Sequence, residues 1–402
     1  MMSQISPPPG VNAPRLVIGV TSSQTCLVLA GRLRGLREAG FDVTLLSSPG
    51  ELLNSTVAAE KVGCVAVPVK REIAPLSDLV SLFRLWRVLH RLKPDLVEFS
   101  TPKAGLLGVI AARLCRVSVR IYLLRGLKLE TVQGLKRSLL LVAEKLAAAS
   151  AHAVVCNSES LRAKVFALGI APADKLHVLG DGSSRGVDVQ RFSPGVSVVR
   201  ERLGIPASAS VIGFVGRLTR DKGVPELVEV FEAILAVEPE VHLLFAGWFD
   251  EAEDALDGPL RARILRHPRM HYTGFVSDTV AYYRAMDVLA LPTWREGFPN
   301  AVLEAGASGI PVVTTLATGS RDAVLPEVTG LLIPPGYPEA LQEALLRLLR
   351  DPALRSRMGA AARAWIIEHY GNDRVVGLTA GFYRKLFEAK SGRTRATVPT
   401  GE

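Results

Sequence analysis

The sequence predicts an α/β protein of two doubly wound domains, each built on a parallel sheet. Its 402 residues exceed what one typical core accommodates. Apolar strand-like runs alternate with helical patterns in both halves, which indicates βαβ units. A stretch rich in Gly, Ser and Pro at 181–195 separates the two series and reads as a linker. Two domains of similar length joined in this way lead us to expect a central cleft between them.

The strand-like runs are continuously apolar, as expected for strands buried on both faces. In the first half they lie at 15–23, 41–48, 64–69, 96–101, 119–126, 151–158 and 175–180. In the second half they lie at 210–218, 241–248, 270–275, 288–293, 311–315 and 330–336. The clearest helical patterns are 76–92, 134–149, 338–370 and 374–388. We therefore expect a disordered segment 1–14, domains at 15–190 and 191–372, a helix 373–390 packing back on the first domain, and a disordered tail 391–402.

The positive charge is concentrated in the first half. Residues 1–195 carry 25 Lys/Arg against 14 Asp/Glu, whereas the remainder carries 23 against 25. Such a basic surface can bind nucleic acid, an anionic membrane or an anionic substrate. Because no helix-turn-helix, zinc ligand set or aromatic-basic RNA motif accompanies it, we favour a membrane surface or a lipid diphosphate over nucleic acid.

Cysteine usage and hydropathy favour a cytoplasmic protein. The four cysteines are widely spaced, show no metal-type pairing and lie in apolar segments, so we expect buried, reduced thiols. The first 15 residues have no apolar signal core. The most apolar runs, 105–115 and 138–156, fall short of a membrane span, and we expect both to be buried helices.

The most informative segment is 295–311, REGFPNAVLEAGASGIP, with Glu296 and Glu304 eight positions apart. It follows a strand, so the glutamates should lie at the carboxyl edge of a sheet, where open α/β folds bind ligands. Pro299 suits the first helical turn, whose free N–H groups attract anions. Carboxylates beside such a site suit sugar or ribose hydroxyls. The alternative is an exposed acidic helix start.

A second segment, GRLTRDKG at 216–223, also follows a strand directly. Arg217 and Lys222 flank its tight turn, an arrangement that suits a diphosphate. The alternative for either side chain is ordinary surface charge.

Together these segments resemble the Glu-x7-Glu signature of retaining nucleotide-sugar glycosyltransferases of family 4, which have the GT-B fold of two Rossmann-like domains facing a cleft. The resemblance covers about residues 15–388. Segments of the first half, at 100–108, 120–131, 156–161 and 178–188, are similar to bacterial enzymes that assemble capsule, exopolysaccharide or O-antigen repeat units on undecaprenyl diphosphate.

The resemblance implies an acceptor-binding first domain and a nucleotide-sugar-binding second domain. Arg217 and Lys222 would hold the diphosphate, Glu296 the sugar hydroxyls and Glu304 the ribose. Gly216 would admit the donor close to the backbone. The remaining implied contacts are the backbone groups of Gly297, Phe298 and Asn300 around sugar and phosphate, and walls at 245–248 and 273–275 around the base.

Two positions depart from the family pattern. Thr21-Ser22-Ser23 stands where many members have a Gly-Gly turn, and Arg125 stands where many have a histidine. An arginine cannot act as a general base at neutral pH, but it can bind an acceptor phosphate. Alternatively, it could pair with Glu130 or Glu144 on the surface. Lys103, at an expected helix N-terminus, is a second acceptor candidate.

We expect no required metal or cofactor, because no Asp-x-Asp ends a strand. The acidic run Asp250, Glu251, Glu253 and Asp254 is expected on a solvent-facing helix start. Arg217 and Lys222 would instead offset the leaving-group charge. The resemblance implies retention of configuration by front-face attack, with a donor phosphate oxygen taking the acceptor proton.

The resulting expectation is an enzyme at the inner face of the cell membrane that moves a sugar from a nucleotide donor, UDP first and GDP next, to a lipid-linked saccharide. One alternative is a sugar-nucleotide epimerase of the same fold, which would need acid/base carboxylates or histidines. The others are a non-catalytic scaffold and a nucleic-acid binder.

Overall fold

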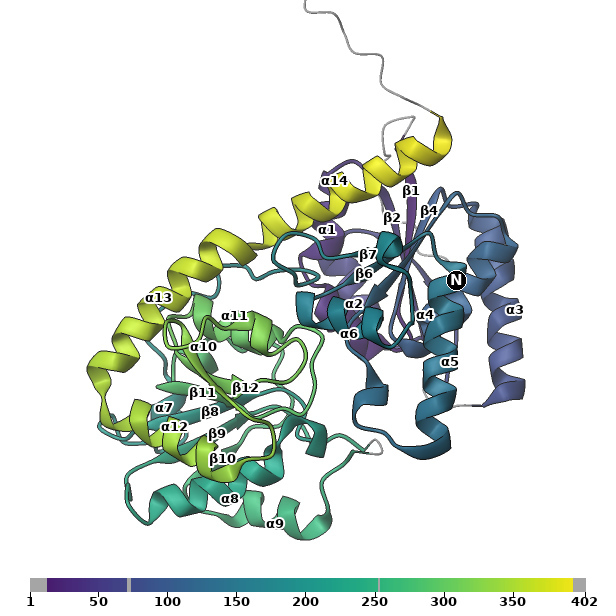
Figure 1. Ribbon diagram of the computed structural model, residues 1–402. Helices are drawn as coiled ribbons and strands as arrows, with labels where there is room; N and C mark the ends of the chain where they lie inside the picture. The colour runs from purple at the N-terminus through teal and green to yellow at the C-terminus, as the bar shows by residue number, and fades with distance from the viewer. Residues whose placement is uncertain (1–12, 71–73, 252–253, 393–402) are drawn as a thin grey trace, which may run out of the picture. The chain divides into compact units, whose positions relative to one another are not determined.

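The computed structural model describes residues 13–70, 74–251 and 254–392, and the chain divides into two compact units (Figure 1). The first contains the chain up to Asn157, Arg162–Gly180 and the chain from Asp373. The second contains Ser158–Leu161 and Asp181–Asn372. The segments expected to be disordered, 1–14 and 391–402, lie outside the described residues except for 13, 14, 391 and 392.

The first unit is built on a seven-stranded parallel sheet with the order β3-β2-β1-β4-β5-β6-β7. Its strands are β1 (Arg15–Gly19), β2 (Asp42–Ser47), β3 (Gly63–Ala66), β4 (Leu96–Ser100), β5 (Val119–Leu124), β6 (Ala153–Cys156) and β7 (Leu176–His177). The first predicted strand ends early, at Gly19, and a 3₁₀ helix, Ser23–Leu29, follows. Its helices are α1 (Arg32–Glu38), α2 (Glu51–Glu60), α3 (Pro75–Leu92), α4 (Pro102–Leu114), α5 (Gly134–Ser150), most of α6 (Glu159–Ala167), and α14 (Asn372–Ser391).

The last helix, α14, is tied to the first sheet by a buried polar cluster. Arg32 on α1 donates to both carboxylate oxygens of Glu98 on β4, at 2.8 and 2.5 Å. Tyr383 on α14 donates to the same carboxylate, and all three side chains are buried. Burial alone would raise the pKa of Glu98, but Arg32, together with the charge of Arg125 and the Tyr383 hydrogen bond, outweighs burial and holds that pKa below its usual value. The carboxylate therefore stays charged. Loss of either partner would leave a buried charge uncompensated, which destabilises a fold.

The second unit is a six-stranded parallel sheet with the order β10-β9-β8-β11-β12-β13. Its strands are β8 (Val211–Val215), β9 (His242–Ala246), β10 (Met270–Tyr272), β11 (Val288–Leu291), β12 (Val312–Thr315) and β13 (Gly330–Ile333). Its helices are α7 (Val199–Arg202), α8 (Val224–Leu235), α9 (Gly258–Arg266), α10 (Val280–Tyr283), α11 (Asn300–Ala307), α12 (Pro338–Arg350) and α13 (Pro352–Tyr370). The strand order reverses between β8 and β11, and such switch points are where doubly wound sheets bind ligands.

Two expectations about buried segments are wrong in part. Cys26 and Cys156 are buried, but Cys64 and Cys115 are partly exposed. The helix within 138–156, α5, turns apolar side chains outward, with Leu139, Val142 and Leu146 each about half exposed. Among the described residues, no helix is long and apolar enough to cross a membrane.

Candidate functional site

The two motifs of the second half meet at the carboxyl edge of the second sheet. The loop after β8 and the loop after β11 are joined through Asp221, whose backbone oxygen accepts from Trp294 N at 2.9 Å and Thr293 Oγ1 at 3.0 Å. The Arg295 guanidinium bonds the Asp221 carboxylate at 2.9 and 2.6 Å. These bonds fix both loops at the β8/β11 switch point.

Lys222 and Glu296 form an ion pair across these loops, with side chains 20% and 14% exposed. Backbone geometry sets both positions. Gly223, which follows Lys222, has φ +72°, and a Cβ there would lie 2.0 Å from Pro292 O. Glu296 N donates to Thr318 O at 3.0 Å. A cation and a carboxylate are thus held together at the sheet edge.

Arg217 pairs with Asp250, which corrects one expectation. Asp250 is 8% exposed and does not lie on a solvent-facing helix start. Its neighbour Glu251 is exposed and bonds Arg261 at 2.7 Å, and Glu253 lies outside the described residues. The acidic run therefore splits, and one member faces the cation expected to bind the diphosphate.

Glu304 lies one turn inside α11 and is held by two donors. Arg185 Nη2 donates to Glu304 Oε1 at 2.6 Å, and Tyr283 Oη donates to Glu304 Oε2 at 2.9 Å. Burial, followed by the Glu304 charge, raises the pKa of Tyr283 well above its ordinary value, so the phenol remains a donor. Sequence reasoning missed Arg185. The available signal was that it is one of only two cations, with Arg191, in the linker segment 181–195.

Pro299 is the N-cap of α11 rather than a residue of its first turn, and the helix begins at Asn300. The Phe298 side chain is buried and packs on Tyr370, with ring centroids 5.2 Å apart. Gly297 passes so close to Gly319 that a Cβ on Gly319 would lie 2.5 Å from Gly297 O. The structure thus gathers these residues in one tight turn, and their contacts with a donor remain predictions.

Three glycines meet beside the end of β8. Gly216 has φ +142°, and a Cβ there would meet nothing within 4 Å. A Cβ on Gly247 would lie 1.7 Å from Gly216 O, and Gly247 bridges Gly274. Trp248 and Phe275 pack edge to face at 5.3 Å. The two segments expected around the base therefore lie together next to Gly216, and the base contact itself remains a prediction.

The acceptor candidates lie at the carboxyl edge of the first sheet. Lys103, in the first turn of α4, bonds Asp78 at 2.8 Å. Arg125, just after β5, donates from Nε to Ser100 Oγ at 3.1 Å. The alternative of a surface pair with Glu144 is wrong, because Glu144 is buried and accepts from Tyr122 Oη at 2.6 Å.

Thr21, which follows the first strand, supports the start of α4. Its hydroxyl lies 2.6 Å from Thr101 Oγ1 and accepts from Ala104 N at 3.1 Å. It thereby satisfies one free N–H group of the first turn of α4, the turn that carries Lys103.

Two histidines that lie close to each other are at the opposite edge of the second sheet from the candidate site residues. His242 Nδ1 and His271 Nε2 are 2.8 Å apart, and both side chains lie near the amino-terminal starts of β9 and β10. Burial lowers the pKa of His242 to about 4, so it is neutral at physiological pH. Within the described ranges, no three His, Cys, Asp or Glu side chains are grouped so that they could hold a metal ion.

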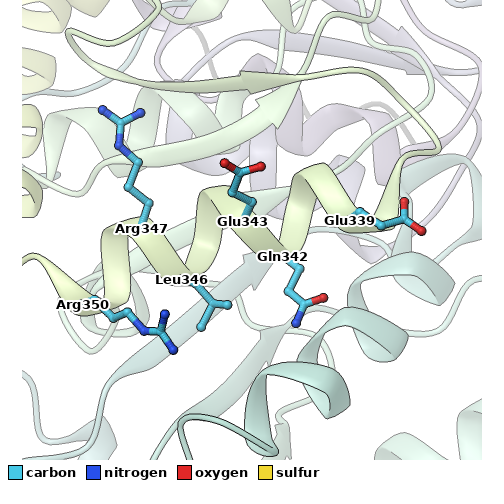
Figure 2. Close-up of a pocket in the computed structure, with 6 residues that line it drawn as sticks. All are labelled: Glu339, Gln342, Glu343, Leu346, Arg347 and Arg350. Carbon is cyan, nitrogen blue, oxygen red and sulfur yellow. The ribbon is translucent and has the colours of Figure 1, made fainter.

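A surface depression on α12 contains none of the candidate residues (Figure 2). The side chains that line it all come from one helix, and two of them are tied elsewhere: Arg347 to Glu327 and Arg350 to Glu238. We assign it no function.

Comparison with known proteins decides the family. The model described as "Glycosyl transferases group 1" matches residues 209–351, and that described as "Glycosyl transferase 4-like domain" matches residues 28–182. The capsular polysaccharide biosynthesis glycosyltransferase CapM of Staphylococcus aureus is 34% identical over 375 residues, which is 93% of this chain and 98% of CapM. The chain belongs to the family 4 glycosyltransferases.

Two further similarities bear on this glycosyltransferase. The UDP-Gal:alpha-D-GlcNAc-diphosphoundecaprenol alpha-1,3-galactosyltransferase of Escherichia coli is 28% identical over 78% of this chain and 81% of that protein. Anabaena HepE, solved in complex with UDP and glucose, superposes with a TM-score of 0.77 at 21% identity, over 92% of this chain and 98% of that one. The second similarity establishes the shared GT-B fold.

Proposed function

We propose that this glycosyltransferase moves a sugar from a UDP-sugar to an undecaprenyl-diphosphate-linked saccharide during assembly of a surface polysaccharide such as capsule. The observation that carries the proposal is the Lys222–Glu296 ion pair at the switch point of the second sheet, with Arg217 in the loop after β8 and Glu304 on the helix after β11. The names of the relatives support its finer parts: CapM for capsule, and the E. coli enzyme for a UDP-sugar and a diphosphoundecaprenol acceptor.

The charges of the site suit the parts of a nucleotide-sugar. Two cations offer charge-assisted hydrogen bonds to a diphosphate, and two carboxylates can accept from hydroxyl groups. Lys222 with Arg217 would hold the diphosphate, Glu296 the sugar and Glu304 the ribose. Backbone groups of Gly216, Gly297, Phe298 and Asn300 would line the donor.

The proposed mechanism requires no metal. As the bond to the leaving diphosphate breaks, Arg217 and Lys222 offset the developing negative charge from fixed positions. A donor phosphate oxygen accepts the proton of the attacking acceptor hydroxyl on the same face, so the anomeric configuration is retained.

Nucleotide binding tests the donor site directly. We expect calorimetry to give tight binding of UDP and weaker binding of GDP and ADP. Glu304→Ala should weaken UDP binding roughly 10-fold or more, because a hydrogen bond to a charged group is worth about 1.5–3 kcal/mol. An exposed carboxylate of the same unit, Glu343, provides the control variant Glu343→Ala. No binding of any of the three nucleotides would contradict the proposal.

Stereochemistry tests the proposed mechanism. Proton NMR of the transfer product should show the same anomeric configuration as the donor sugar, whichever sugar that is. An inverted product would contradict front-face attack and require a general base on the protein.

The partner proposed for the first unit is an anionic membrane surface, and two helices support this. On α3, Leu76, Leu79, Val80 and Phe83 are 49–82% exposed at i, i+3, i+4 and i+7 spacing, which places them on one side of the helix. On α5, Leu135, Leu139, Val142 and Leu146 are 51–91% exposed at similar spacing. Both helices contact α4. We call these eight side chains the α3/α5 face.

The charges around the α3/α5 face are of one sign. The only acid of α3, Asp78, bonds Lys103, and the only acid of α5, Glu144, is buried against Tyr122. The exposed charged side chains of the two helices are all basic: Arg84, Arg87, Arg91, Arg137 and Lys145. Exposed apolar side chains on helices whose exposed charges are all basic suit the headgroup region of an anionic bilayer. A membrane there would present a lipid-linked acceptor near the sheet edge that carries Lys103 and Arg125.

Vesicle co-sedimentation tests this surface. We expect binding to vesicles containing anionic phosphatidylglycerol, with weaker binding to neutral phosphatidylcholine vesicles and in high salt. Leu79→Ser with Phe83→Ser should reduce partitioning about 10-fold or more, because burying one large apolar side chain is worth about 1.5–3 kcal/mol.

The matched control is Val237→Ser with Leu265→Ser, two comparably exposed apolar side chains of the second unit. It should leave partitioning unchanged. Equal losses in the two double variants, or no loss in either, would contradict the proposed surface.

A further inference from the structure

The loop that carries Arg185 is fixed by its own backbone. Val187 N donates to Tyr370 O at 2.8 Å, and Asn372 N donates to Val187 O at 2.9 Å. Asn372 Nδ2 donates to the backbone oxygen of Arg185 at 2.5 Å. Gly186 has φ +64°, and a Cβ there would lie 2.4 Å from Tyr370 O. These contacts hold the backbone of Arg185 in place without its side chain.

The side chain of Arg185 therefore has a separate role. Its hydrogen bonding within the described part of the chain goes to Glu304 alone, and its buried Nε has no acceptor there. Both side chains of the pair are largely buried, at 13% and 11% exposure. The bond from the guanidinium to Glu304 is therefore not needed to hold the loop.

The two carboxylate oxygens of Glu304 are each held by a donor from a different element. Arg185 approaches from the linker loop, and Tyr283 approaches from α10 with its ring fully buried against Phe192. A carboxylate offers about four acceptor positions, so two bonds leave acceptor capacity unused. Because the carboxylate is already held in place before the ligand binds, less side-chain entropy is lost on binding.

We propose that Arg185 is a positioning residue that orients Glu304 to recognise the ribose of the donor nucleotide. This inference rests on the proposed function, in which Glu304 accepts from the ribose hydroxyls. It makes the linker loop, outside both signature motifs, a determinant of how well the enzyme distinguishes a ribonucleotide from a deoxyribonucleotide.

The test is the ratio of the dissociation constants of 2′-deoxy-UDP and 3′-deoxy-UDP to that of UDP, measured by calorimetry on the full chain. At least one ratio should be about 10 or more in the wild type, as expected for a hydrogen bond to a charged acceptor. Arg185→Ala should weaken UDP binding and bring that ratio close to 1. Arg185→Lys, which keeps the charge but loses the planar fork, should give an intermediate ratio.

The control is Arg200→Ala, which removes a partly buried ion pair, with Asp287, in the same unit. It should lower stability and leave the ratio unchanged. If Arg185→Ala does not fold, the same ratio is measured on Arg185→Gln, which keeps most of the side-chain length.

The outcomes separate the two claims. A folded Arg185 variant that keeps the wild-type ratio overturns the positioning role while the donor site stands. A wild-type ratio near 1, or one that Glu304→Gln leaves unchanged, overturns the ribose contact itself and with it that part of the proposed function.

Discussion

Pairing of buried charge at one sheet edge organises the second unit. Glu304 is almost fully enclosed, and a carboxylate in such a place must be matched by donors. Arg185 and Tyr283 supply them, so the linker loop, α10 and α11 converge on one carboxylate. Two further ion pairs lie on the neighbouring loops: Lys222 with Glu296, and Arg217 with Asp250. The fold places these loops together because β8 and β11 are adjacent and parallel.

This pairing has a consequence for donor binding under the proposed function. Each cation assigned to the diphosphate already has a carboxylate partner. An incoming diphosphate therefore shares or replaces that partner, and Glu296 becomes available to the sugar hydroxyls. Each cation then has an anionic partner both before and after the donor binds, and the hydroxyl groups of the sugar can donate to the displaced Glu296.

The sequence predicted what depends on local pattern. Continuous apolar runs located the strands, and the positions of Arg217, Lys222, Glu296 and Glu304 after strands located the sheet edge. Partners were not predictable, because they come from distant segments: Arg185 is 119 positions from Glu304. Asp250 was misplaced because an acidic run looks like a helix start when its partner, 33 positions away, is unknown. The α5 helix was expected to be buried because apolar residues surround it, and hydropathy does not state which side faces solvent.

A crystal structure of the enzyme with UDP bound tests the proposed donor site most directly. We expect the diphosphate within hydrogen-bond distance of Lys222 and Arg217, and the ribose hydroxyls on Glu304 with Arg185 still bonded to that carboxylate. UDP bound with its diphosphate away from both cations, or its ribose away from Glu304, would contradict the proposed donor site.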